Sequence, residues 1–286
     1  MFYQIELEWI QAIQTIHTVF LNHFFYLWNY VETTYFYYFL VLFVWIWFGW
    51  KWGARLFYLI FSANLLCYYL KDIIQSPRPF QMLENIAHPE VISFGLPSGA
   101  GVNAALLSGL LIFLWKQHKT LAWIIGGLFF SLLSFSRIYL GVHFFHDIIG
   151  GWILGFLVLW AFISFGPRIE KQLKKRPLWV FFLIGELFPL SIYLQYPSDI
   201  LLREITFSLM GMTAGLVLSA KYHLLPSNIP ISDRKLEGCI TFLGSILLTM
   251  VGIFWVHRSL IPFVVIVWFS VGSLYLFRLK NHYFHY

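Results

Sequence analysis

Charged residues are scarce in this chain. Asp, Glu, Lys and Arg make up 11% of its 286 residues, whereas charged residues make up roughly 25% of a soluble domain. Hydrophobic residues account for 59% of the sequence. This composition excludes an ordinary soluble protein and predicts an integral membrane protein.

Cysteine is also rare. The two cysteines, Cys67 and Cys239, both lie in apolar segments. They predict neither a disulfide framework nor a metal site, and the sequence shows no other cluster of metal ligands. We therefore expect no metal and no cofactor.

The N-terminal segment lacks the pattern of a cleavable signal peptide, because Glu6 and Glu8 stand among its apolar residues. We expect the first spanning helix to act as its own signal. Between Phe2 and Val19, apolar residues recur at helical spacing, with Glu and Gln opposite them. This pattern predicts an N-terminal amphipathic helix in the membrane interface, which we assign to residues 1–33. A helix packed against the bundle is an equal alternative.

Long apolar segments fill the remaining chain with only short connections between them. A spanning helix needs roughly 20 mostly apolar residues. We predict an all-α fold, a polytopic transmembrane helical bundle of about nine spans, without an extramembrane domain. The predicted spans are Thr34–Trp50, Gly53–Leu70, Gly101–Trp115, Leu121–Leu140, Ile148–Phe165, Leu178–Leu194, Leu201–Ala220, Cys239–Val256 and Leu260–Phe277.

Most of the 19 lysines and arginines fall in the connections on one side of this bundle. The positive-inside rule makes that side cytoplasmic. This topology explains the net charge of +6, so no nucleic-acid partner is implied. Lys71, Arg78 and Arg137 are exceptions on the outer side, which suggests that they hold an anion.

Three polar segments lie on the outer side. Lys71 stands in the last turn of the second span, and Arg78 follows between two prolines that force an extended exit. Pro97-Ser98-Gly99 opens the third span, where a serine N-cap and free backbone N–H groups make a ready phosphate site. The segment Ser136–Asp147 joins the fourth and fifth spans. The topology brings all three segments to one face.

Each of these features alone has an ordinary structural explanation. Lys71 fits a snorkelling lysine at a helix end, Ser98 fits a common helix start, and His143 fits a loop histidine. Together they are harder to explain in this way, because ionisable groups at a membrane edge cost free energy unless they are used. We therefore predict a phosphate-binding pocket near His143 and Asp147.

The three segments resemble the signature of a known family. Lys71-x6-Arg78-Pro79, Pro97-Ser98-Gly99 and Ser136-Arg137-x5-His143-x3-Asp147 are similar to the three-part motif of the type 2 phosphatidic acid phosphatase superfamily. Its members are membrane lipid phosphatases related to vanadium haloperoxidases. The resemblance covers about residues 57–165, so we assign residues 34–166 to a phosphatase core and 167–286 to additional C-terminal helices.

The resemblance implies a role for each motif residue. A phosphoryl group is expected to be bound by Lys71, Arg78, Ser98, Gly99 and Arg137. His143 is expected to be the nucleophile that forms a phosphohistidine, and Asp147 is expected to orient it. The chemistry agrees, because cations stabilise the charge that develops on the phosphoryl oxygens. His146 is a rival nucleophile, but it has no carboxylate three or four residues further on, which favours a packing or interface role.

One position departs from the family. The second motif usually continues with a histidine that acts as general acid for the leaving group, and here that position is Ala100. A methyl group donates no proton, and general acid catalysis is worth about 10²–10⁴-fold. The chain is therefore an inactivated variant, a natural pseudoenzyme that binds lipid phosphate, or an enzyme whose substrate does not need the acid.

The third explanation predicts a substrate preference. The alkoxide that leaves a lipid monophosphate is strongly basic, whereas a diphosphate releases a phosphate monoester with a second pKa of about 6. An active protein is then expected to prefer a lipid diphosphate, such as a polyprenyl diphosphate. His88, in the outer loop Phe80–Leu96, is an alternative proton donor.

The sequence thus predicts a lipid phosphate or diphosphate phosphatase that acts on the extracytoplasmic side through a phosphohistidine intermediate. The alternatives are a lipid phosphotransferase, a non-catalytic lipid-phosphate-binding or structural membrane protein and, with less support, a transporter. The expected partners are the lipid substrate and the bilayer, with no nucleic acid and no assigned oligomeric state. We expect a bacterial inner (plasma) membrane, with the site facing the periplasm or exterior, since no retention signal is evident.

Overall fold

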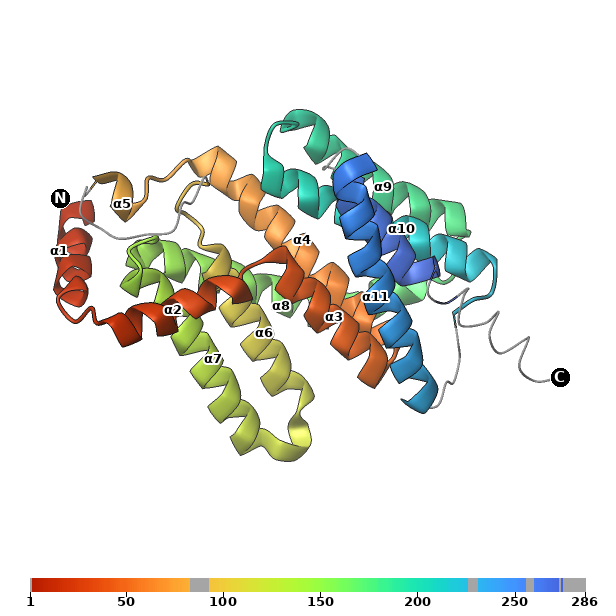
Figure 1. The fold of residues 1–286 in the computed structure, drawn as a ribbon, viewed down its shortest axis with the longest axis horizontal. Helices are drawn as coiled ribbons and strands as arrows, with labels where there is room; N and C mark the ends of the chain where they lie inside the picture. Colours follow the sequence, from red (N-terminus) through yellow and green to blue (C-terminus); the bar gives the residue numbers. More distant parts are fainter. Residues whose placement is uncertain (1, 83–92, 226–230, 256–259, 273, 275–286) are drawn as a thin grey trace. The chain divides into compact units, whose positions relative to one another are not determined.

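The computed structural model describes residues 2–82, 93–225, 231–255, 260–272 and 274. Every regular element among these residues is helical, which confirms the all-α prediction (Figure 1). The α-helices are α1 Phe2–Gln14, α2 Val19–Val31, α3 Thr34–Phe48, α4 Trp50–Ile74, α5 Pro79–Met82, α6 Gly99–Leu114, α7 Lys119–Tyr139, α8 Phe145–Leu173, α9 Leu178–Gln195, α10 Ile200–Lys221, α11 Ile231–Trp255 and α12 Ile261–Val267. The 3-10 turn η1 is Lys116–His118, and the short π-helical segment η3 is Trp268–Gly272.

Helix length and hydropathy support fewer membrane spans than the sequence predicted. Within the described residues, five helical segments are long and apolar enough to cross a membrane, or up to six if α2 and α3, bent by 64°, form one span. The five segments are Trp50–Met82, Lys116–Tyr139, Phe145–Leu173, Leu178–Gln195 and Ile200–Lys221. The count of nine is therefore not confirmed.

Three of the predicted spans correspond, within the described residues, to apolar helices of 10–17 residues. The predicted spans at Gly101, Cys239 and Leu260 correspond to the shorter apolar helices Gly99–Leu114, Gly238–Thr249 and Ile261–Gly272. At about 1.5 Å per residue, the 16 residues of α6 reach about 24 Å, which is less than the roughly 30 Å of a bilayer core.

The chain forms two compact units. One contains Met1–Tyr37 and Leu66–Phe165, and the other contains Tyr38–Leu65 and Gly166–Tyr286. The motif residues named above all belong to the first unit. The division into residues 1–33, 34–166 and 167–286 stays a prediction.

In the first unit, α6 and α7 lie side by side as an antiparallel hairpin joined by η1 (Figure 1). The start of α6 packs directly against the start of α8 through glycines. A Cβ atom on Gly101 would lie 2.7 Å from the carbonyl oxygen of Ile148, and one on Gly155 would lie 2.5 Å from that of Val102. This backbone contact holds the second motif against the third.

The N-terminal helices α1 and α2 pack against this hairpin and the start of α8. Ile10 of α1 is fully buried with Ile138, Phe144 and Ile148. Phe25 of α2 is buried with Tyr139. The helix expected over Phe2–Val19 ends at Gln14, and its buried contacts favour the packed alternative. Its location in a membrane interface stays a prediction.

In the second unit, α10 packs against α9 and α12 and carries buried polar side chains. Thr213 of α10 is 2.9 Å from the hydroxyl of Tyr58, and Ser208 is 2.5 Å from the hydroxyl of Tyr38. Arg55 pairs with Glu170, with 2.7 Å between Nη2 and Oε2. The hydroxyls of Ser208 and Thr213 are thus hydrogen-bonded to tyrosines of other helices, which offsets the cost of their burial.

Candidate active site

A helix C-cap sets the position of His143. At the end of α7, Gly141 has φ 66°, a left-handed conformation that glycine adopts without steric cost. The Gly141 N–H donates to Ile138 O at 2.9 Å, and the Val142 N–H donates to Arg137 O at 3.1 Å. These two bonds form a Schellman motif. The turn therefore ends α7 just after Arg137 and leads directly into His143.

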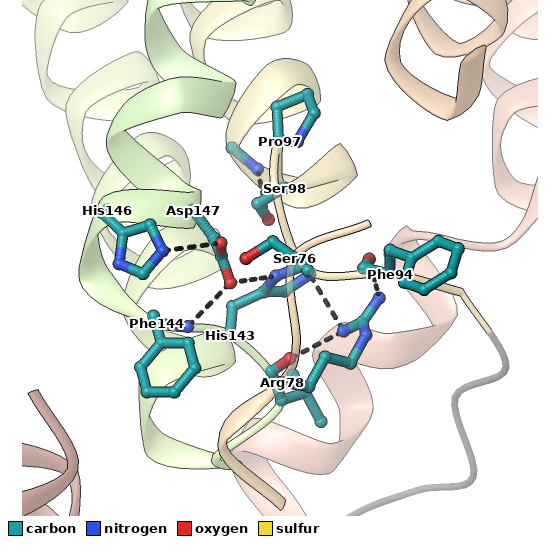
Figure 2. A network of polar contacts seen from close by, with 12 residues as sticks. Ser76, Arg78, Phe94, Pro97, Ser98, His143, Phe144, His146 and Asp147 are labelled. Atoms are coloured by element: carbon teal, nitrogen blue, oxygen red, sulfur yellow. Dashed lines mark hydrogen bonds and ion pairs between the residues drawn. The ribbon is translucent and has the colours of Figure 1, made fainter. Parts of the chain in front are cut away.

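His143 and Asp147 form a buried pair at the start of α8. Nδ1 of His143 lies 3.2 Å from Oδ2 of Asp147 (Figure 2). The same oxygen accepts the Phe144 N–H at 3.0 Å, and the backbone carbonyl of Asp147 accepts the Ser98 N–H at 2.9 Å. The carboxylate is thus fixed in place by its own helix start, and the turn is tied to the start of α6.

The contacts of His143 define its tautomer. Nε2 lies 3.2 Å from Nη1 of Arg78, and a guanidinium is a hydrogen-bond donor only. Nε2 therefore accepts, so the proton is on Nδ1 and is donated to Asp147. A neutral imidazole in this form has its lone pair on the nitrogen that faces the basic residues, which is the form a nucleophilic histidine needs.

The surroundings of His143 favour this neutral form. Burial lowers the pKa of His143 well below its ordinary value, and the positive charges of Arg78, Lys71 and Arg137 lower it further. The desolvation of a charged imidazolium and its repulsion by cations both disfavour protonation, so both lower the pKa.

We predict that His143 remains unprotonated at about pH 6, where an exposed histidine is largely protonated. An unfolded chain takes up this proton near pH 6.5, whereas the folded protein does so well below that value. The free energy of unfolding should therefore fall as the pH falls from about 6.5 towards the lower folded pKa. NMR titration of protein labelled with ¹⁵N-histidine, with the signal assigned by His143→Gln, measures this. Half-protonation of His143 near pH 6.5 contradicts the prediction.

Arg78 and Lys71 both bind the segment that precedes α6. Arg78 donates to the carbonyls of Ser93 at 2.5 Å, Phe94 at 3.0 Å and Val142 at 2.7 Å (Figure 2). Lys71 donates to Phe94 O at 2.6 Å and to Gly95 O at 2.8 Å. Both cations are buried. Neutral carbonyl oxygens accept their hydrogen bonds, although an anionic oxygen would be the stronger acceptor.

Gly95 allows this segment to approach the pair. Its N–H donates to Ser76 O at 2.8 Å. A Cβ atom at this position would lie 2.8 Å from Oδ2 of Asp147 and 2.7 Å from Pro77 O. Sequence reasoning did not identify Gly95, because the requirement arises from a contact with a residue far along the chain.

Ser98 caps α6 as predicted. Its hydroxyl accepts the Gly101 N–H at 3.3 Å, and the helix begins at Gly99. Ala100 is fully buried in a cluster with Ala104 and Leu133. The residue at the general-acid position therefore lies within apolar packing.

Arg137 is held on two sides. Its Nε donates to the Ser136 hydroxyl at 3.0 Å, and its Nη1 lies 3.1 Å from Oε2 of Glu32. Its Nη2 is buried and has no hydrogen-bond partner in the described part of the chain. Glu32, the C-cap residue of α2, was missed from the sequence; a lone carboxylate at the end of an apolar helix was the available signal.

His146 has a carboxylate partner that local spacing does not reveal. Its Nδ1 lies 2.7 Å from Oε2 of Glu6 in α1, and its Nε2 lies 3.4 Å from Oδ1 of Asp147 (Figure 2). It also stacks on Phe144. These contacts are compatible with the packing role expected for it. His88, the alternative proton donor, lies outside the described residues.

The site thus combines a buried His–Asp pair, whose Nε2 faces Arg78, with three basic side chains from α4, from the segment before α5 and from α7. With its membrane-spanning helices, the protein is an integral membrane protein whose geometry suits phosphoryl transfer. Residues 52–171 match the model of the PAP2 superfamily. The predicted resemblance is confirmed.

Two similar proteins carry the names of lipid phosphatases. The chain is 35% identical over 132 residues to phosphatidylglycerophosphatase B of Bacillus subtilis, covering 43% of this chain and 63% of the relative. It is 30% identical over 131 residues to undecaprenyl-diphosphatase of Sulfolobus acidocaldarius, covering 43% of this chain and 62% of the relative. The chain therefore spans less than two thirds of each relative's length.

A solved structure shares the fold over a larger part of the chain. The transmembrane PAP2-type phosphatidylglycerolphosphate phosphatase from Bacillus subtilis superposes with a TM-score of 0.50 at 28% sequence identity. The match covers 58% of this chain and 87% of the solved one.

Proposed function

We propose that this protein is a membrane lipid phosphatase that cleaves lipid phosphates or diphosphates through a phosphohistidine on His143. The observation that carries the proposal is the orientation of His143. Its Nδ1 is bonded to Asp147, and its Nε2 faces Arg78. The names of the relatives support the same class of reaction.

In the proposed reaction, Nε2 of His143 attacks the phosphorus atom, and Asp147 stabilises the charge that the ring acquires. Lys71, Arg78 and Arg137 stabilise the phosphoryl oxygens. Ser98 contributes its hydroxyl, and Gly99 contributes its backbone N–H at the start of α6. Water then releases phosphate from the phosphohistidine.

Substrate entry requires the basic residues to exchange partners. Lys71 and Arg78 now donate to the carbonyls of Ser93, Phe94 and Gly95. The buried Nη2 of Arg137 has an unused donor capacity that a phosphoryl oxygen would satisfy. We infer that a phosphoryl group replaces the carbonyls, because charge-assisted hydrogen bonds are about twice as strong as neutral ones.

Ala100 supports a preference for diphosphates. A diphosphate loses a weakly basic phosphate monoester, and a monophosphate loses a strongly basic alkoxide. Without the usual histidine to donate a proton, the rate of diphosphate cleavage falls less than the rate of monophosphate cleavage. We propose a polyprenyl diphosphate as the preferred class of substrate, with Ala100 as the residue that sets the preference.

The proposed location is a bacterial inner (plasma) membrane, with the site facing the periplasm or exterior. The excess of basic residues on the opposite side supports this orientation. The helices after residue 166 form an addition that the superfamily match barely reaches, since it ends at residue 171.

Phosphate release by the purified protein tests the proposal. A polyprenyl diphosphate and phosphatidic acid are compared in the same detergent, and we expect kcat/KM to be at least about tenfold higher for the diphosphate, given the 10²–10⁴-fold value of a general acid. Comparable values would remove the diphosphate preference.

The alternative is a lipid-phosphate-binding protein without turnover, which Ala100 favours. Saturable binding of both lipids with no phosphate release from either would support it.

A further inference from the structure

Glu32 brings a carboxyl group to the phosphate-binding residues from an unexpected part of the chain. Its Oε2 lies 3.1 Å from Nη1 of Arg137. Its Oε1 is buried and has no hydrogen-bond partner among the described residues. The side chain as a whole is 26% exposed. One carboxylate oxygen thus binds a proposed phosphate ligand, and the other is available for a proton.

The C-terminal end of α2 packs against the cluster that contains Ala100, where the usual histidine is absent. Trp28 and Val31, the latter directly before Glu32, pack against the buried cluster of Ala100, Ala104 and Leu133. The helix that carries Glu32 therefore covers the site of the absent histidine.

The charges around Glu32 are those of the proposed phosphate pocket. Besides Arg137, its carboxylate interacts electrostatically with Lys71 and Arg78, and also with the titratable groups of Tyr37 and Cys67. Tyr37 and Cys67 are buried. Glu32 is therefore the acidic group that faces these cations from α2.

We propose that Glu32 partly replaces the missing histidine as proton donor to the leaving group of lipid monophosphates, so that a diphosphate remains the preferred substrate. This proposal rests on the proposed phosphatase function. It also refines that function, because it assigns Glu32 a role in monophosphate cleavage and little role in diphosphate cleavage, whose leaving group needs no proton donor.

The proton can be followed through both half-reactions. The substrate enters with one proton on its phosphoryl group. As this group binds Arg137, its proton is transferred to the carboxylate of Glu32. The bond between phosphorus and Nε2 of His143 then forms as the bond to the lipid oxygen breaks. Glu32 gives its proton to that oxygen, and a neutral alcohol departs.

In the second half-reaction, Glu32 acts as the base. Its carboxylate takes a proton from the water that attacks the phosphohistidine. The bond between phosphorus and nitrogen breaks, His143 returns to its neutral form, and the proton leaves Glu32 with inorganic phosphate. The reaction therefore consumes only water.

The test compares Glu32→Gln with the unaltered protein on a lipid monophosphate and a lipid diphosphate of the same chain length. We expect kcat for the monophosphate to fall about 10²–10⁴-fold, and kcat for the diphosphate to fall less than about tenfold. Retained diphosphate turnover also demonstrates that the variant is folded. In the background of Glu32→Gln, Ala100→His should restore monophosphate turnover.

Two matched variants separate proton donation from other roles. Glu8→Gln removes an exposed carboxylate of α1 and should leave both reactions unchanged. Ser136→Ala removes the other group that holds Arg137, at 3.0 Å from its Nε, and should affect both substrates alike.

Several outcomes would overturn the proposal. Equal losses on both substrates in Glu32→Gln would mean that Glu32 only positions Arg137, and higher activity would mean that its carboxylate blocks the anion site. A second measurement uses the unaltered protein: kcat/KM for a series of monophosphates should depend only weakly on the basicity of the leaving alcohol, and a steep dependence argues against an acid. If the unaltered protein releases no phosphate from either lipid, the proposed function fails as well.

Discussion

His143→Ala is expected to lower kcat for phosphate release on the order of 10⁴-fold or more, for both mono- and diphosphates. The substitution removes the proposed nucleophile, whose Nε2 lies 3.2 Å from Nη1 of Arg78. Rapid acid-free quenching with a ³²P-labelled substrate should trap a phosphohistidine in the unaltered protein and none in the variant.

Two histidine variants serve as comparisons for this result. His118→Ala changes an exposed residue of η1 and should leave turnover unchanged. His146→Ala tests the rival nucleophile, and the trapped phosphohistidine should persist because Nδ1 of His146 is engaged with Glu6. If the trapped intermediate were lost in His146→Ala and retained in His143→Ala, the nucleophile would be His146 and the proposed role of His143 would be wrong.

Asp147→Asn is expected to lower kcat on the order of 10³-fold, with a smaller change in KM. An amide oxygen can still accept the hydrogen bond from Nδ1 of His143, but the negative charge that stabilises a phosphorylated imidazole ring is lost. Steady-state kinetics on a lipid diphosphate measures the effect, because that substrate depends least on the proton donor.

A second Asp→Asn substitution provides the control. Asp199 caps α10, where its Oδ1 accepts the Leu202 N–H at 2.8 Å. Asparagine is an equally good N-cap, so Asp199→Asn should alter neither stability nor turnover. If Asp147→Asn were as active as the unaltered protein, the proposed role of the His–Asp pair would be wrong.

Local sequence was a reliable guide wherever a short segment specifies its own geometry. His143 lies just before α8 and Asp147 lies in its first turn, so the short turn between them brings the two side chains together. Ser98 before Gly99 predicted the N-cap of α6, and the structure contains that cap. In each case, the interacting groups are neighbours along the chain, so the pattern contains the contact.

Helix length was predicted less well. The expected helix Phe2–Val19 is interrupted after Gln14, and a second helix, α2, begins at Val19. Residues 15–18 form this break, and three of them, Thr15, His17 and Thr18, are polar. Thr18 is the N-cap at which α2 begins, and its hydroxyl accepts the Leu21 N–H at 3.2 Å.

The sequence by itself determined the all-helical class, the membrane character and the motif that resembles the PAP2 superfamily, whose model matches residues 52–171. Only the tertiary structure decided which distant groups join the motif. Glu32 reaches Arg137 across 105 residues, Glu6 reaches His146 across 140, and the backbone of Phe94 and Gly95 binds Lys71. The physical reason is that periodicity and spacing describe contacts within one helix or turn, whereas these partners meet only when separate helices pack.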